Sequence, residues 1–244
     1  MRGDSGFPVR IAFTKEGKVR FISHRDVARA FERAFRIEGL PLAFTQGFSP
    51  RPKVSFGLAL SVGHESDGEY LDLELAEAID LDELADRLSA ALPEGIEVYG
   101  VVPLADRAPA LQEAVSAVEW AIEITPVTPD AAAVPEIVAA RAAAILAAPE
   151  LRVTRVRKGR ASEDDIRPAI RHLSVVGPST TGTHLTAELA TRPTSLRPAE
   201  LVAALGSEFR EGRVRRTRQW IERGEERLDP LVADPRNTLE VRAS

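Results

Sequence analysis

The chain has 244 residues, 44% of them hydrophobic and 28% charged, a composition that suits a globular protein of one large or two ordinary domains. It contains no cysteine, which excludes disulfides, thiolate catalysis and an iron–sulfur cluster held by the chain's own thiolates. Because there is no apolar run of about eighteen residues and no apolar signal segment near the start, we expect a cytoplasmic protein.

The formal net charge of −5 is unevenly distributed along the chain. Residues 1–60 carry 11 Lys and Arg against 5 Asp and Glu, residues 61–150 carry 3 against 19, and residues 151–244 carry 18 against 13. Two basic segments therefore flank an acidic one. Since local basic clusters decide where a polyanion docks, the sequence is compatible with a nucleic-acid partner in spite of its net negative charge.

The first part of the chain predicts alternating strands and helices. In chain order we expect a strand at 9–14, a hairpin turn at 15–18, a strand at 19–22, a helix from 24, short strands at 42–44 and 54–60, a strand at 69–75, a helix from 80 and a strand at 96–102. This order is typical of the split β-α-β, or ferredoxin-like, motif, and we place one such domain at residues 1–105.

The first helix has clear start and stop signals. Ser23 is the expected N-cap, and Asp26 stands three residues later, where a carboxylate closes a capping box. Gly39 and Pro41 supply the expected end. The apolar residues recur at spacings of three and four, which predicts one buried helix face: Val27, Ala30, Phe31, Ala34 and Phe35.

Arginines on this helix form a second stripe. Arg25, Arg29, Arg33 and Arg36 recur at helical spacing, and Glu32 is the acid best placed to neutralise them. Arg25 and its neighbour His24 lie on the first turn, where helix N–H groups and a guanidinium could together meet a phosphate. The alternative is an ordinary solvated helix face.

A stiff loop follows the helix. Pro50 and Pro52 restrict their own backbone and that of the preceding residues, so that the loop side chains are held in place. Phe48 could stack on a ligand or anchor the loop in the core. With the helix residues, the predicted ligand-binding set is His24, Arg25, Arg29, Arg33, Gln46, Phe48, Ser49, Arg51 and Lys53.

These segments resemble a known family. SHRD with AFERAF, then GLPLAFTQGFSPRPKVSFGLAL, HESDGEYLDLEL and LPEGIEV, are similar to the radical-SAM-linked protein family, over roughly the first hundred residues. The resemblance implies a domain found alone or fused behind a cobalamin-binding radical SAM enzyme, the separate form being commonly encoded near an E/G-type endoribonuclease. Arg51 stands where many relatives carry a histidine, which argues against metal or proton-transfer chemistry at that position.

The second part of the chain predicts a similar order of elements. Strands are expected at 119–124, 151–156, 171–176, 184–191 and 213–221, and helices at 134–148 and 195–205. We therefore expect an α+β protein of tandem ferredoxin-like domains with antiparallel sheets, at 1–105 and 115–223, joined by a connector at 106–114 and followed by a partly ordered tail at 224–244. Arginines from Arg152 to Arg160 and from Arg213 to Arg218 serve either as a ligand surface or as charges that keep edge strands from pairing.

No phosphate-binding glycine loop or metal-ligand spacing is present, and we expect neither a cofactor nor a metal. The first hypothesis is an accessory protein that binds RNA, or another substrate, and presents it to a partner enzyme, such as a radical SAM enzyme or an RNA-processing enzyme. The second is a metal-independent RNA-processing nuclease in which His24 is the general acid or base, by analogy with repeat-processing nucleases of tandem ferredoxin-like fold. The third is a protein-only adaptor of a radical SAM enzyme.

Overall fold

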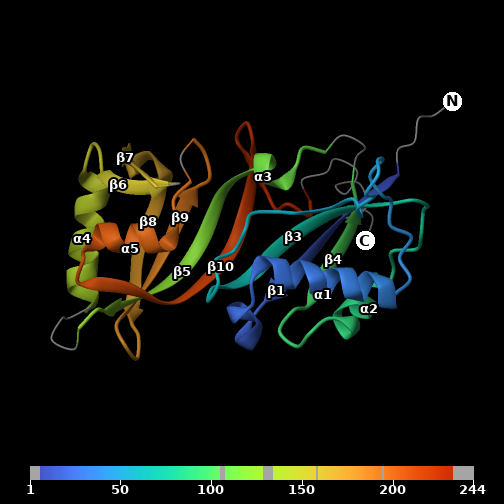
Figure 1. The fold of residues 1–244 in the computed structure, drawn as a ribbon. Helices are drawn as coiled ribbons and strands as arrows, with labels where there is room; N and C mark the ends of the chain where they lie inside the picture. The colour runs from blue at the N-terminus through green and yellow to red at the C-terminus, as the bar shows by residue number, and fades with distance from the viewer. Residues whose placement is uncertain (1–5, 105–107, 129–133, 158, 194, 233–244) are drawn as a thin grey trace. The chain divides into compact units, whose positions relative to one another are not determined.

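The computed structural model describes residues 6–104, 108–128, 134–157, 159–193 and 195–232 (Figure 1). The chain divides into two compact units. Unit 1 comprises Met1–Val115 and Gln219–Ser244, and unit 2 comprises Ser116–Arg218. The chain passes between them at the start of β5 (Val115–Pro126) and within β10 (Phe209–Arg223). Both units combine helices with mostly antiparallel strands.

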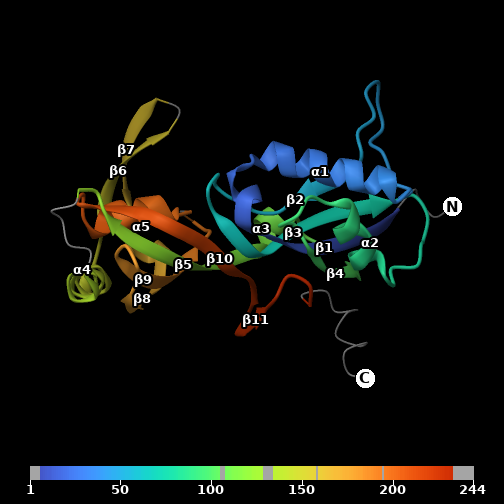
Figure 2. The same cartoon turned by 90° about the horizontal axis from the view of Figure 1, so that it is seen from below.

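Unit 1 is a sheet with helices on one face (Figures 1 and 2). Its strands follow the order β4-β1-β3-β2, and each of these pairs is antiparallel. β2 and β1 both pair with Leu71 of β3, so they lie on opposite edges of that strand. The elements are β1 Phe7–Lys15, η1 Gly17–Phe21, α1 His24–Ile37, β2 Val54–Phe56, β3 Glu65–Leu75, α2 Leu84–Ala91, β4 Val98–Pro103, α3 Leu111–Ala114 and β11 Glu226–Leu228.

The core of unit 1 lies between this sheet and the helices. Because side chains alternate along a strand, one set of β1 and β3 residues faces α1 and α2. That set and the helix residues that contact it are buried: Val9, Ile11, Phe13, Leu71, Leu73 and Leu75 from the strands, and Val27, Phe31, Ala34 and Phe35 from α1. The intervening strand residues, among them Arg10, Asp72 and Glu74, therefore point to the second face of the sheet.

That second face is partly covered by the segment after β10. The buried Arg10 guanidinium forms an ion pair with Asp72 at 2.7 Å and donates a hydrogen bond to the Pro230 carbonyl at 2.9 Å. The Tyr70 hydroxyl donates to Asp229 at 3.0 Å, and burial raises the pKa of this tyrosine. The tail predicted from residue 224 thus includes β11 and a turn that extends to Val232; its remainder lies outside the described residues.

The helix signals read from the sequence are confirmed at α1. Ser23 is the N-cap and forms a capping box with Asp26, whose backbone N–H donates to the serine hydroxyl. Gly39 adopts a φ of 62°, as expected after a helix end, and Leu40 N–H donates to the Phe35 carbonyl.

Three predicted elements of unit 1 were wrong. The hairpin turn at 15–18 and the strand at 19–22 are replaced by η1, because Gly17 has a φ of 63° and Glu16 N–H bonds to the Gly95 carbonyl from the other end of the unit. Residues 42–44 make only two isolated bridges, one of them to Pro52, which has no N–H to continue a ladder. The second predicted helix is present, but it begins at Leu84, four residues after the predicted start.

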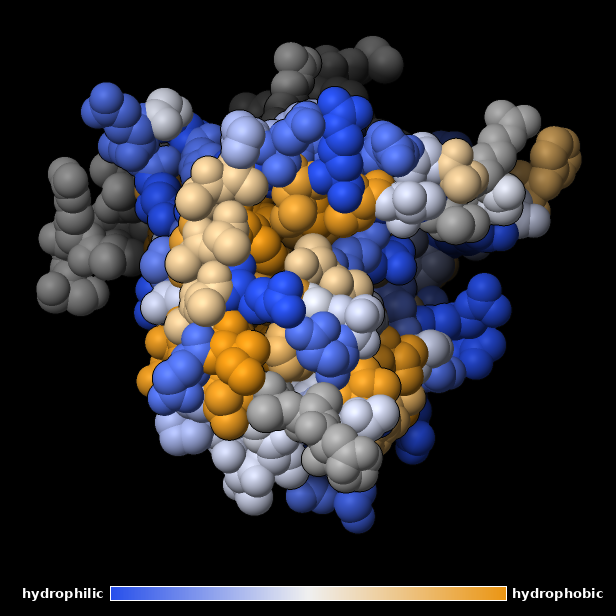
Figure 3. All heavy atoms as spheres, turned by 90° about the vertical axis from the view of Figure 1, so that its left-hand side faces the viewer, coloured by the Kyte–Doolittle hydropathy of each residue, from blue (hydrophilic) through white to orange (hydrophobic). Residues whose placement is uncertain are grey.

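Unit 2 has a sheet in the order β10-β5-β9-β8 and a separate antiparallel hairpin of β6 and β7. The remaining elements are α4 Pro135–Ala147, β6 Arg152–Arg157, β7 Arg160–Asp165, η2 Arg167–Ala169, β8 Ile170–Pro178, β9 Thr183–Ala190 and α5 Pro198–Leu205. Figure 3 faces the end of this unit and shows apolar surface over the alanine-rich α4, interrupted by hydrophilic residues. The sequence did not predict β7, because its residues, RASEDD, have no apolar alternation.

Candidate nucleic-acid interface

The outer face of α1 carries a row of arginines. At about 100° per residue, Arg25, Arg29, Arg33 and Arg36 cluster on the side of the helix opposite to the buried residues. All four are exposed, and the Arg29 side chain is 67% accessible. Helical geometry thus converts the sequence pattern into one outward-facing set, which we call the α1 arginine face.

The α1 arginine face is only weakly neutralised. Arg29 approaches Asp26 at 3.4 Å, and Arg36 donates to the Glu32 backbone carbonyl at 3.4 Å. Within the described ranges, neither Arg25 nor Arg33 forms an ion pair.

Asp26 is mainly occupied by the helix cap. It accepts hydrogen bonds from the Ser23 hydroxyl and backbone N–H, which lower the pKa of this carboxyl, with smaller contributions from Arg29 and Arg25. The α1 arginine face therefore keeps guanidinium N–H donors that an anion could bind.

The proline loop forms a protruding structure, the 43–53 finger. Thr45 N–H donates to the Arg51 carbonyl at 2.9 Å, Arg51 N–H donates to the Thr45 hydroxyl at 3.0 Å, and Lys53 N–H donates to the Ala43 carbonyl at 2.8 Å. Figure 2 shows the finger on the same side of the sheet as α1. The sequence analysis did not single out Thr45. A hydroxyl residue shortly before the Pro-Arg-Pro run could have indicated a side chain that accepts a hydrogen bond from the loop backbone.

The tip of the finger is open to solvent. Phe48 is fully exposed, at 110% of the reference accessibility, and Phe44 is 50% exposed. The neighbouring Gln46, Ser49 and Arg51 are also exposed, and no ion pair of Arg51 occurs among the residues described. The alternative in which Phe48 anchors the loop in the core was therefore wrong.

Lys53, which belongs to the predicted ligand-binding set, does not join the α1 arginine face. Its ammonium group pairs with Glu74 at 2.8 Å on the second face of the sheet. The reason is strand alternation: Val54 packs toward the core, so Lys53 and Ser55 on either side of it point the other way. Arg51 and Lys53 border a shallow hollow there together with Asp72 and Glu74.

His24 is exposed, and its ring packs edge-on against Phe56 with centroids 5.2 Å apart. It borders a small hollow with Lys15 and Glu69. The Lys15 ammonium group donates to the carbonyls of Arg20 and Ile22, which explains how this charge is buried. In the described part of the chain, no group of three or more His, Asp or Glu side chains is placed to hold a metal ion.

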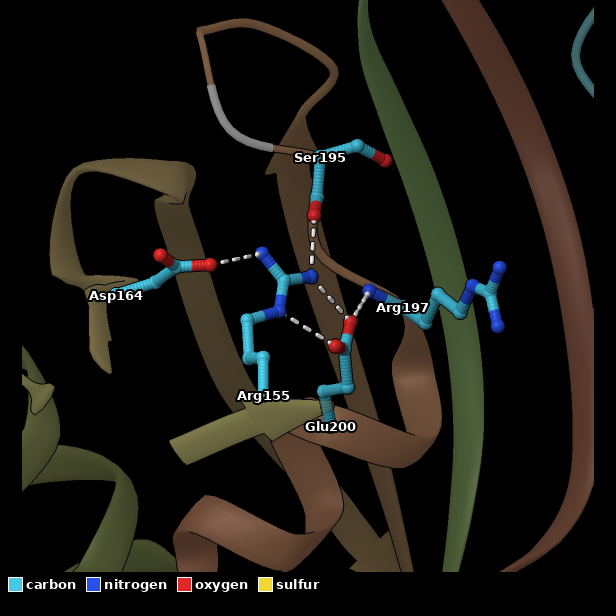
Figure 4. Close-up of polar contacts among 5 residues, drawn as sticks. All are labelled: Arg155, Asp164, Ser195, Arg197 and Glu200. Carbon is cyan, nitrogen blue, oxygen red and sulfur yellow. Dashed lines mark hydrogen bonds and ion pairs between the residues drawn. The ribbon is translucent and has the colours of Figure 1, made fainter. Parts of the chain in front are cut away.

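Arg155 of β6 behaves differently from the arginines of α1. Arg155 is buried, and its guanidinium bonds to Glu200 through two contacts of 2.7 Å and to the Ser195 carbonyl at 2.6 Å (Figure 4). Burial raises the pKa of Glu200, but the hydrogen bond from Arg155 opposes it, and the net result is a lowered pKa. Arg155 thus joins the β6–β7 hairpin to the start of α5 and is not available to a ligand.

The profile of one family, uncharacterized proteins conserved in bacteria (DUF2344), matches residues 9–198. The chain belongs to this family. The match begins in β1 and ends at the first residue of α5, so the DUF2344 region includes parts of both units. The family description does not mention radical SAM enzymes, and no curated protein matches the chain.

Three solved structures have limited similarity to this DUF2344 chain. An H/ACA ribonucleoprotein bound to a substrate RNA containing 2′-deoxyuridine matches 89% of this chain and 53% of that one, with 13% identity and a TM-score of 0.42. A Cbf5–Nop10–Gar1 complex matches 90% of this chain and 54% of that one, with 13% identity and a TM-score of 0.45. An RAMP protein binding different RNA substrates matches 86% of this chain and 99% of that one, with 10% identity and a TM-score of 0.21. The chain spans about half the length of the first two. Similarity at this level assigns no function.

No helix among the described residues is long and apolar enough to cross a membrane.

Proposed function

We propose that this protein is an accessory protein that binds RNA on the helix side of unit 1 and presents it to a partner enzyme. The observation that carries the proposal is the α1 arginine face, with four exposed guanidinium groups in one row and no ion pair at Arg25 or Arg33 within the described residues. Guanidinium groups bind phosphates through paired N–H donors, and a row of them follows a sugar–phosphate backbone.

The finger extends the proposed interface. Gln46 and Ser49 offer hydrogen-bonding groups for base edges. Arg51 is exposed at the base of the finger and borders the hollow on the second face of the sheet. His24 would meet the ligand at the first turn of α1, where the helix N–H groups favour an anion. Lys53 belongs to the proposed set only as a residue of the finger's base, since its charge is paired with Glu74.

The two strand orders support tandem ferredoxin-like domains. In that fold a β-α-β-β-α-β chain places its strands in the antiparallel order 4-1-3-2. Unit 1 has β4-β1-β3-β2, and unit 2 has β10-β5-β9-β8 once the β6–β7 hairpin is treated as an insertion. We infer two such domains, near the predicted 1–105 and 115–223, with the segment that includes β11 added to the first.

The second face of the unit 1 sheet is partly covered, and this also favours the helix side as the binding surface. Domains that bind RNA on an open sheet stack bases on exposed aromatic side chains of the central strands. Here Arg10 and Tyr70 of the central strands are buried, and their polar groups bond to Pro230 and Asp229. The helix side, in contrast, presents exposed cations.

Two other functions follow from the sequence. The first is a protein-only adaptor of a radical SAM enzyme, which rests on the family resemblance. The same resemblance suggests the kind of partner enzyme, a radical SAM enzyme or an E/G-type endoribonuclease. A metal-independent nuclease would use His24, which is exposed and oriented by Phe56. The two functional classes differ in one observable: a nuclease cleaves the RNA that it binds, and His24→Ala would abolish cleavage but preserve most of the affinity.

Ultraviolet crosslinking of the full chain to RNA in cells, followed by mass spectrometry of the crosslinked peptides, tests the proposal. We expect crosslinks in peptides from α1 and the 43–53 finger. Crosslinks confined to unit 2, or recovery of a radical SAM enzyme without RNA, would contradict it. RNA that is shortened on incubation with the wild-type protein, but not with His24→Ala, would identify the nuclease instead.

A further inference from the structure

We propose that the 43–53 finger binds an unpaired base by stacking it on Phe48, so that the substrate class is single-stranded RNA. This inference rests on the proposed RNA-binding function and adds a specificity to it. The starting observation is energetic: an aromatic side chain that is 110% exposed gains no stability from burial within its own unit. It is therefore available to an outside partner.

The finger holds this ring away from the body of unit 1. Three hydrogen bonds donated by backbone N–H groups link Thr45 with Arg51 and Ala43 with Lys53, and they close its stem. Pro50 and Pro52 restrict the returning arm, and Gly47, with a φ of 130°, allows the sharp turn before Phe48. A partner that stacks on Phe48 would thus meet a ring on a largely pre-ordered support, which reduces the entropy cost of binding.

The surroundings of Phe48 favour a nucleic acid over an apolar protein pocket. Residues 39–64 contain no Asp or Glu, although the whole chain contains 37 of them. A phosphate backbone that approaches the tip of the finger therefore meets no carboxylate of that segment. Arg51, at the base, has no ion pair among the described residues and borders the hollow that also contains Asp72 and Glu74. The finger also lies on the side of the sheet that presents the α1 arginine face (Figure 2).

Stacking on Phe48 requires a base that is free to leave its helix. In an RNA duplex the bases are stacked on each other, and proteins recognise the duplex mainly by its shape, its phosphates and its 2′-hydroxyls. Single strands can rotate bases outward onto an aromatic ring with little regard to sequence. The α1 arginine face would then supply phosphate contacts to either form, and Phe48 would supply the preference for single strands.

Fluorescence anisotropy with a labelled uridine-rich RNA, single-stranded or annealed to its complement, tests this preference. Phe48→Leu keeps the apolar volume and removes the π face, so we expect single-strand binding to weaken about tenfold. Phe48→Tyr keeps the ring and should bind as the wild type does. Duplex binding should be the same for all three proteins.

The outcomes separate this inference from the proposed function. If Phe48→Leu binds single strands as well as the wild type does while Arg25→Ala/Arg33→Ala weakens binding, the finger inference is wrong and the RNA-binding function stands. If Phe48→Leu weakens single-strand and duplex binding equally, the claimed preference is wrong. If no RNA binds to the wild type, both proposals fail, and the finger is left as a surface for a protein partner.

Discussion

Two arginines from the basic segments of the chain, Arg29 and Arg155, have opposite environments. On α1, Arg29 is 67% accessible and its nearest carboxylate is 3.4 Å away. On β6, the Arg155 side chain is 5% accessible and is held by Glu200 at 2.7 Å. Both lie in sequence runs rich in arginine. The comparison shows that charge density along the sequence does not determine whether a guanidinium holds the fold together or remains available for a ligand.

The difference has a physical consequence. A buried guanidinium has lost its hydration, so removal of its partners leaves an uncompensated charge and destabilises the fold. An exposed guanidinium contributes little to stability, but it can release counterions from a bound polyanion. Mutation of Arg155 should therefore lower the stability of the fold, and mutation of the α1 arginine face should weaken binding.

The largest expected effect is at Arg155. Arg155→Ala leaves Glu200 and the Ser195 carbonyl without their main donor. We expect it to destabilise unit 2 by about 3 kcal/mol, the lower end of the range for a broken buried ion pair, because Glu200 is 30% accessible to solvent. Urea unfolding measures the change. Arg152→Ala is the matched control, since that arginine is 63% accessible and pairs only with Glu150 among the described residues. Equal effects of the two variants would contradict the assignment.

The same pair predicts a dependence of stability on pH. The pKa of Glu200 is lowered in the folded state, so its ionised form contributes stability above the ordinary value of 4.5, and that contribution is lost as the pH falls through the lower folded value. Unfolding midpoints between about pH 6 and pH 3 should decline less steeply in Glu200→Gln than in the wild type. Parallel declines would show that Glu200 does not contribute.

Ser23 offers a smaller test in unit 1. Ser23→Ala removes the hydroxyl that accepts from Asp26 N–H and donates to its carboxylate, and should destabilise α1 by about 1 kcal/mol. Thermal unfolding followed by circular dichroism detects it. Ser23→Asp, which retains an N-cap acceptor, should recover most of the loss, and a failure to do so would point to a role other than capping.

The smallest expected effect on binding is at Lys53. Because Lys53 pairs with Glu74 on the second face of the sheet, Lys53→Ala should change RNA affinity by less than about twofold, within the small range of a partly exposed ion pair. Filter binding of RNA compares it with Arg33→Ala. A larger loss of affinity in Lys53→Ala than in Arg33→Ala would place the interface on the second face of the sheet and contradict the proposed helix-side interface.

Features fixed by neighbours along the chain could be predicted from the sequence. α1 follows from Ser23, the apolar spacing and Gly39, all within one short segment, and the alternation of Glu69–Leu75 correctly indicated a strand. The stripe of exposed arginines on α1 follows from the same helical period. These elements depend on local backbone geometry, which the sequence pattern encodes directly.

Features that depend on distant partners could not be predicted. η1 is set by a hydrogen bond between Glu16 and Gly95, and the burial of Arg155 depends on Glu200, which lies 45 positions further along the chain. The orientation of Lys53 depends on how β2 pairs with β3. For Phe48, composition favoured the core, because a phenylalanine is more often buried than exposed.

The central claim is that the α1 arginine face binds the RNA backbone, and the salt dependence of binding tests it most directly. The slope of log affinity against log salt should fall in magnitude by about 1.4 in Arg25→Ala/Arg33→Ala, since each lost phosphate contact on a single strand removes about 0.7. Arg152→Ala should retain the wild-type slope. An unchanged slope in the double variant, or an equal loss in Arg152→Ala, would contradict the account.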